Sequence, residues 1–179
     1  MKAPRFQIQT LRALALLIIL AATALLADEP GVRAVLQSAS ERKAAPEFAL
    51  EDRSGKTASV KDYRGKVLLL DFWATWCHGC KQEIPWFVEF HRKYGAEGLS
   101  VVGVSLDSDG WKVVKPFLNA SDVPYRIVLG NDGVAKQYGI ASMPDTYLID
   151  RDGKIAAVYS GLVNKDDVEA NIQKMLSLH

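Results

Sequence analysis

The chain has 179 residues, and its 22 basic and 21 acidic side chains leave a formal net charge of +1 at pH 7. This balance gives no sign of nucleic-acid binding, and no basic stripe runs through the sequence. The length suits a single domain that is large enough to bury a core.

The chain begins with a leader typical of exported proteins. Lys2, Arg5 and Arg12 precede an uncharged run, 13–27, that is rich in Leu, Ile and Ala. This run is shorter than the roughly 20 residues that comfortably span a bilayer. Residues 1–27 are therefore predicted to be a cleaved signal peptide, with an uncleaved N-terminal membrane anchor as the alternative. Either would place the rest of the chain in the periplasm or another extracytoplasmic space.

A polar stretch, 28–44, separates the leader from the predicted domain, 45–179. We interpret this stretch as a linker with a short helix, because Val32, Val35 and Leu36 could share one side of it.

Strands and helices are predicted to alternate through the domain. Residues 46–51 and 57–60 flank a turn and predict a small β-hairpin. The apolar run 67–73 predicts a buried central strand. The remaining elements are expected as helix 80–94, strand 99–106, helix 111–118, strand 125–129, short helix 133–138, a hairpin of 146–150 with 155–159, and helix 165–178. This order predicts an α/β fold with layers around a mixed sheet.

The only two cysteines, Cys77 and Cys80, directly follow the buried strand. Their spacing lets both sulfurs meet at one helix N-terminus, where backbone N–H groups and the helix dipole favour a thiolate. A disulfide that closes so small a loop adds little stability, so it suits a redox switch better than a staple. Cys77 is expected to attack a substrate disulfide, and Cys80 to resolve the mixed disulfide.

Metal and haem chemistry fit the cysteine pair poorly. A structural zinc site needs four ligands, and the only histidines are His78, His91 and His179. Haem attachment would need a histidine directly after Cys80, where Lys81 stands. No metal and no cofactor other than a redox-active Cys77–Cys80 disulfide is therefore expected.

Three ionisable residues near the cysteines are candidates for tuning the chemistry. Asp71 puts a carboxyl inside a core strand. Without a partner, such a buried acid has a raised pKa and stays neutral. The alternative is a structural acid that is paired with another group. Glu83 lies three residues after Cys80 and is either beneath the site or an ordinary solvent-facing glutamate. A protonated His78 would stabilise the Cys77 thiolate and make the couple more oxidising, whereas an exposed His78 would have little effect.

A resemblance to the thioredoxin superfamily rests on the motif FWATWCHGCK at 72–81, with Glu83 and Pro85 after it. The sequence looks most like the exported TlpA-like and ResA-like branch, which is associated with cytochrome c maturation. The resemblance covers roughly residues 45–178. It implies a thioredoxin fold, in which helices flank a central mixed β-sheet, with an N-terminal β-hairpin and an inserted helix–strand segment.

The same resemblance implies roles for further residues. Met143-Pro144 stands where the family carries a cis-proline facing the disulfide, and there the backbone of the preceding residue pairs with substrate. The family often has threonine after this proline, so Asp145 is expected to add a negative charge near the groove. The substrate-binding groove is expected to be completed by Trp76, His78 and Gly79.

Two acids are also interpreted through the resemblance. Asp71 has the position of the buried aspartate that, in thioredoxin, carries a proton to the inner cysteine. The ResA-like branch carries an acidic residue at the position of Glu83. Many of those relatives have an amide where Asp71 stands, so a chain with both acids departs from the pattern, and the two would titrate as a coupled pair if close.

Together these features predict an exported thiol–disulfide oxidoreductase that reduces disulfides in partner proteins, apocytochrome c among them. It would be a monomer that binds no nucleic acid and is recharged by a thiol-reducing electron donor in the membrane. One alternative keeps the chemistry and makes the protein an oxidant or isomerase. A thiol peroxidase is a second, although Leu70 and Ala74 replace the proline and threonine of peroxidases. A non-catalytic binding module that uses the groove beside Pro144 is a third.

Overall fold

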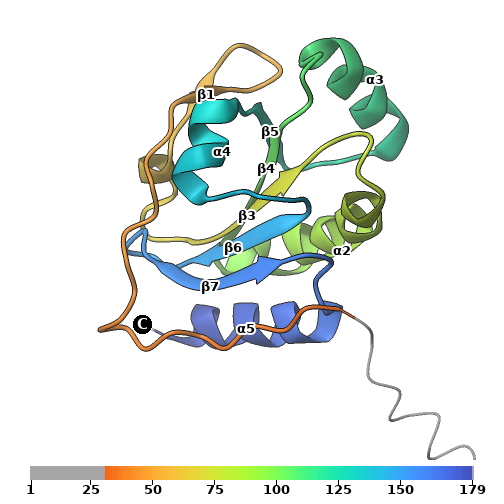
Figure 1. Ribbon diagram of the computed structural model, residues 1–179. Coiled ribbons are helices and arrows are strands. Elements are labelled where there is room, and N and C mark those ends of the chain that lie inside the picture. Colours follow the sequence, from red (N-terminus) through yellow and green to blue (C-terminus); the bar gives the residue numbers. More distant parts are fainter. Residues whose placement is uncertain (1–30, 179) are drawn as a thin grey trace, which may run out of the picture.

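A computed structural model of the chain describes residues 31–178, so the leader predicted over 1–27 lies outside the described residues. Its centre is a five-stranded sheet in the order β5-β4-β3-β6-β7 (Figure 1). The strands are β3 (Val67–Trp73), β4 (Leu99–Ser105), β5 (Arg126–Leu129), β6 (Asp145–Ile149) and β7 (Ile155–Ser160). The first three of these run parallel, and β6 and β7 pair antiparallel, so the sheet is mixed as predicted.

The helices cover both faces of the sheet. One face packs against α2 (His78–Tyr94), α3 (Trp111–Ser121) and α5 (Lys165–Ser177). The other packs against α4 (Asp132–Tyr138) and the small hairpin of β1 (Leu50–Glu51) and β2 (Thr57–Ala58). Figure 1 shows α4 and α5 on opposite sides of the sheet. Two 3-10 helices, η1 (Val60–Tyr63) and η2 (Gly95–Glu97), complete the elements of the described chain.

Strand β3 owes its continuous apolar run to this double cover, since all of its residues are buried. Leu69 and Trp73 point toward the face covered by α2, α3 and α5, whereas Leu70 and Phe72 point toward α4. The predicted inserted segment is α3 with β5, and it extends the sheet beyond β4. No helix in the described part of the chain is long and apolar enough to cross a membrane.

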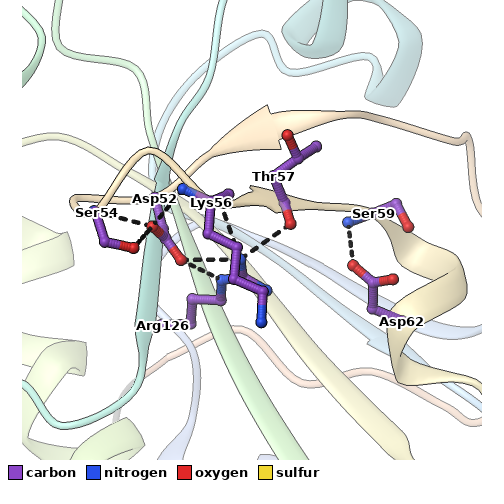
Figure 2. A network of polar contacts seen from close by, with 7 residues as sticks. All are labelled: Asp52, Ser54, Lys56, Thr57, Ser59, Asp62 and Arg126. Atoms are coloured by element: carbon purple, nitrogen blue, oxygen red, sulfur yellow. Dashed lines mark hydrogen bonds and ion pairs between the residues drawn. The ribbon is translucent and has the colours of Figure 1, made fainter.

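The β1–β2 hairpin is tied to β5 by one arginine (Figure 2). Arg126 donates from Nε to Asp52 Oδ2 at 2.9 Å, and from Nη2 to the carbonyls of Lys56 and Thr57. Asp52 Oδ1 accepts from the N–H and the hydroxyl of Ser54. These hydrogen bonds, led by the one from the Ser54 hydroxyl, hold the pKa of Asp52 well below its usual range.

Residues 31–45, here called the amino-terminal strap, run along β7 and α5 (Figure 1). The backbone N–H of Gln37 donates to Ala156 O at 2.8 Å, and Ile155 donates to Lys43 O at 2.8 Å. The predicted short helix is therefore wrong, because residues 32–37 form no helical turn and most backbone hydrogen bonds of the strap reach distant parts of the chain. Val35 is 91% exposed while Val32 and Leu36 are partly buried, so the three share no face.

Candidate active site

The two cysteines lie at the N-terminus of α2 and form a disulfide, with their Cα atoms 5.3 Å apart. Cys77 is the N-cap residue, and the backbone N–H of Cys80 donates to its Sγ at 3.2 Å. After reduction, this N–H and the helix dipole would stabilise a thiolate on Cys77. Cys80 is fully buried, whereas Cys77 keeps 5% of its surface, so Cys77 is the sulfur nearer to solvent.

A carboxylate at the end of β4 holds the loop that leads into Cys77. Asp107 accepts from the Thr75 N–H at 2.9 Å and from its hydroxyl at 2.6 Å. The Ser105 hydroxyl donates to the same carboxylate at 2.9 Å. Sequence reasoning missed Asp107 and Thr75. Their positions could have indicated the contact, because Thr75 follows β3 and Asp107 follows β4. The C-terminal ends of neighbouring parallel strands lie at the same edge of a sheet.

The predicted proline faces the first turn of α2. The Met143–Pro144 peptide bond is cis, as the resemblance implies. A Cβ placed on Gly79 would lie only 3.2 Å from Pro144 Cδ, so a glycine lets the helix approach the proline closely. Trp76 is 67% exposed and offers an apolar rim beside Cys77.

His78 is exposed and sits directly after Cys77 at the start of α2. Its Nε2 lies 3.1 Å from the side-chain amide nitrogen of Gln82, one turn along the same helix. The structure thus brings Gly79 and Pro144 into contact distance and leaves His78 at the surface.

Both candidate acids are fully buried. Glu83 Oε1 accepts from the backbone N–H of Val163 at 2.7 Å. Its other oxygen and both carboxylate oxygens of Asp71 find no hydrogen-bond partner within residues 31–178. The alternative of a solvent-facing Glu83 is therefore wrong.

Burial sets the protonation of the two acids. Burial is the largest cause of the raised pKa of Asp71. The nearby Thr146 side chain lowers this pKa, and the Asp145 charge raises it slightly. Burial also raises the pKa of Glu83, and the Asp71 charge raises it further. Each acid therefore disfavours the charge of the other, and the two titrate as one system.

Asp145 does not present its charge to the groove as expected. Its residue surface is only 4% exposed, and burial raises its pKa. Asp145 pairs with Phe72 across β3 and β6, whereas Thr146 pairs with Asp71. Because alternate residues of a strand point to opposite faces, the Asp145 side chain lies on the other face of the sheet from Asp71.

The redox centre of the site is the cysteine pair itself. Among residues 31–178, no group of three or more histidine, cysteine, aspartate or glutamate side chains is arranged to hold a metal ion.

Comparisons with known proteins agree with this geometry. The model of the AhpC/TSA family matches residues 42–158. The chain is 34% identical over 135 residues to thiol-disulfide oxidoreductase ResA of Bacillus thuringiensis subsp. konkukian, which covers 74% of this chain and 77% of that protein. It is 35% identical over 134 residues to thioredoxin-like protein YneN of Bacillus subtilis, covering 74% of this chain and 78% of the relative.

A solved structure shows the same fold. The crystal structure of a protein assigned as thiol:disulfide interchange protein DsbE from Chlorobium tepidum superposes with a TM-score of 0.72. The two share 34% sequence identity, and the match covers 80% of this chain and all of the other. The thioredoxin-like fold implied by the motif is thereby confirmed.

Proposed function

The chain belongs to the AhpC/TSA family and is a thioredoxin-like thiol–disulfide oxidoreductase, and from that premise we propose that it works outside the cytoplasm as a reductant of disulfides in partner proteins. The disulfide at the N-terminus of α2 is the observation that carries the chemistry. Two buried acids, Glu83 one turn after Cys80 on α2 and Asp71 on β3, support a reaction in which the inner cysteine must lose a proton.

In the proposed reaction, reduced Cys77 attacks a substrate disulfide as a thiolate. One substrate sulfur leaves as a thiolate, and the other stays joined to Cys77 as a mixed disulfide. Cys80 then gives its proton to the Glu83–Asp71 pair and attacks Cys77 Sγ. The Cys77–Cys80 disulfide forms, the second substrate thiolate leaves, and two electrons have passed to the substrate.

The raised pKa values of the acids suit this proton transfer. A general base works best when its pKa lies near the operating pH, and an ordinary carboxyl is too acidic for that. Burial moves the pKa of Glu83 and of Asp71 in the required direction.

Substrate would lie in the groove beside Pro144. The backbone of Met143 is the proposed pairing partner for the substrate chain, with Trp76 as an apolar contact, and His78 and Gly79 flanking the sulfur. This part of the proposal rests on the contact between Gly79 and Pro144 and on the exposure of Trp76.

The leader of residues 1–27 supports action outside the cytoplasm, either free after cleavage or anchored. Because the disulfide must be reduced again after each turnover, a thiol-reducing donor in the membrane is the proposed electron source. Apocytochrome c is a proposed substrate, on the resemblance to the ResA-like branch. A monomer is proposed because the groove must stay open to a protein.

The first experiment is the reduction potential of the Cys77–Cys80 couple, measured by equilibration with dithiothreitol or glutathione buffers. A value near about −270 mV, as in thioredoxin, is expected for a reductant. A value toward about −120 mV, as in DsbA, would instead assign the protein a role as an oxidant. The same titration on His78→Ala reports how far the histidine moves the potential.

Variants of the cysteines test the chemistry itself. Cys77→Ser is expected to abolish insulin reduction, and Cys80→Ser is expected to accumulate the mixed disulfide with substrate. Insulin reduction that persists in Cys77→Ser would contradict the proposed nucleophile. Full function of Cys77→Ser in cells would instead support a non-catalytic binding module.

A further inference from the structure

The loop between β7 and α5 connects the parts of the active site. The N–H of Gly161 donates to Pro144 O at 2.9 Å, and the N–H of Val163 donates to Glu83 Oε1 at 2.7 Å. Gly161 thus reaches the proline and Val163 reaches the buried acid. Whatever fixes this loop also fixes where the Glu83 carboxyl lies.

The start of the strap is bonded to the same loop. The N–H of Val32 donates to Leu162 O at 2.7 Å, and Val32 O accepts from the N–H of Asn164 at 2.9 Å. These two bonds form a parallel bridge between Val32 and Val163. Val163 therefore donates its own N–H to Glu83, while its chain neighbours Leu162 and Asn164 are hydrogen-bonded to the strap.

The fit between strap and loop leaves no spare room. A Cβ on Gly31 would lie 2.5 Å from Val163 O and 2.6 Å from Asn164 N, closer than real Cβ atoms come. Gly31 also has φ +138°, a conformation that favours glycine. On the inner side, a Cβ on Gly161 would lie 3.2 Å from Val32 Cγ2. Glycines at both points allow the backbones to meet.

We propose that Gly31 and Val32 are positioning residues for the active site: they lock the loop of residues 161–164, and through the Val163 N–H they hold the Glu83 carboxyl in place. This inference rests on the proton-transfer role given to Glu83 above. The strap thereby connects the proposed proton acceptor to a segment far from it in the sequence.

The ionisable groups that interact electrostatically with Glu83 lie outside the strap. Asp71 from β3 acts most strongly on the Glu83 charge, and Asp145 acts on it more weakly from the other face of the sheet. Glu83 in turn raises the pKa of Tyr125, just before β5, and Cys80 lies one turn before Glu83 on α2. The strap acts through the position of one backbone N–H, which favours the charged form of Glu83.

The test compares two glycine variants in the otherwise unchanged chain. Gly31→Ala pushes a methyl group onto the Val163 backbone. Gly55→Ala is the matched control, because Gly55 has φ +82° and an added Cβ would meet nothing within 4 Å. Both variants carry the backbone penalty, and only the first disturbs the loop. Val32→Pro, which removes the N–H that donates to Leu162 O, is the second variant if Gly31→Ala fails to fold.

The readouts are the Glu83 pKa, from the carbon-13 shift of its carboxyl, and the pH profile of disulfide exchange. Gly31→Ala is expected to raise the Glu83 pKa by about one pH unit, since a hydrogen bond to a charged group has that order of strength. The exchange profile should move the same way, and Gly55→Ala should change neither. If Gly31→Ala or Val32→Pro lowers stability like Gly55→Ala and leaves both titrations unchanged, the inference is overturned.

Glu83→Gln separates this inference from the function on which it rests. If Glu83→Gln leaves the pH profile of exchange unchanged, the proposed role of Glu83 is wrong, and with it the functional meaning of the strap. If Glu83→Gln changes the profile while Gly31→Ala changes nothing, only the strap inference fails. In the Glu83→Gln background, Gly31→Ala should no longer shift the profile.

Discussion

Asp71 shows what a single side chain costs the fold and contributes to the chemistry. Its carboxyl is fully buried, and neither of its oxygens has a hydrogen-bond partner among residues 31–178. Its pKa is raised in the folded protein, so the folded state binds a proton that the unfolded chain releases at about pH 4. Below about pH 4 Asp71 is protonated in both states and does not lower the unfolding free energy. As the pH rises from there toward the folded pKa, the unfolding free energy falls.

Asp71→Asn is therefore expected to stabilise the oxidised protein at neutral and alkaline pH. Its advantage in unfolding free energy should grow above pH 4 by about 1.4 kcal/mol for each pH unit, until the folded pKa is passed. Urea unfolding of wild type and variant at several pH values measures this. Asp109→Asn, at an exposed position, is the control. Parallel stability curves for wild type and Asp71→Asn would contradict a raised pKa.

Some individual residues could be predicted from the sequence, and others could not. The cysteine spacing and a carboxyl inside an apolar run are local patterns, so Cys77, Cys80 and Asp71 were accessible. The partner of Glu83 was not, because the donor is a backbone N–H 80 positions away. A backbone group leaves no mark on the amino-acid type, and any residue but proline could supply it.

At the scale of elements, the loop between β3 and α2 depends on a neighbouring strand end. Asp107 is 8% exposed and accepts from both the backbone N–H and the hydroxyl of Thr75. This loop carries the chain from the sheet to Cys77. Its shape therefore sets where the nucleophile lies.

Asp107→Ala is expected to lower the unfolding free energy by about 2 kcal/mol, the usual value for hydrogen bonds to a charged group. It should also slow disulfide exchange, because Thr75 loses both acceptors. Stopped-flow reaction of the reduced protein with a chromogenic disulfide measures the rate. Asp109→Ala, exposed in the same loop, controls for the lost charge. A stability loss with an unchanged exchange rate would limit Asp107 to a structural role.

The hairpin at the other side of the sheet gives a second prediction. The lowered pKa of Asp52 means that its stabilising effect is present above about pH 4 and is lost as the pH falls toward the folded value. Asp52→Asn should therefore lower the melting temperature at pH 7, and the difference should shrink in acid. Scanning calorimetry measures both, with the exposed Glu51→Gln as control. A difference that is the same at pH 7 and pH 3 would be evidence against this account.

Elements differed in how well the sequence specified them. The apolar run of β3 is of typical strand length and too short for a buried helix, so it indicated a strand. Its predicted bounds match the structure. The strap was misjudged because its partners, Ala156 and Val163, lie more than a hundred residues away. Local periodicity at Val32, Val35 and Leu36 carried no information about such contacts.

At the scale of the molecule, stability should be distributed unevenly. Central β3 pairs with β4 and β6 along its length, whereas the strap lies at the surface and is held by scattered hydrogen bonds. Segments with few buried contacts open at lower free energy than the core.

Native-state hydrogen exchange is expected to show this order. The amides of Val32 and Gln37 should exchange through an opening that costs less than global unfolding, while those of Leu69 and Leu70 should need the whole molecule to unfold. Exchange at rising denaturant concentrations distinguishes the two. Equal opening free energies for both groups would mean that the strap belongs to the same cooperative unit as the sheet.

The strap and the hairpin also bear on how readily the molecule aggregates through the edges of its sheet. Strand β5 is flanked by the bridge between Asp52 and Val128, and β7 is flanked by the strap. An unpaired edge strand can form hydrogen bonds with a strand of another chain, and proteins avoid this aggregation by covering their edge strands. A molecule that acts on other polypeptides therefore offers them less free edge to pair with, because its own chain covers part of both edges of its sheet.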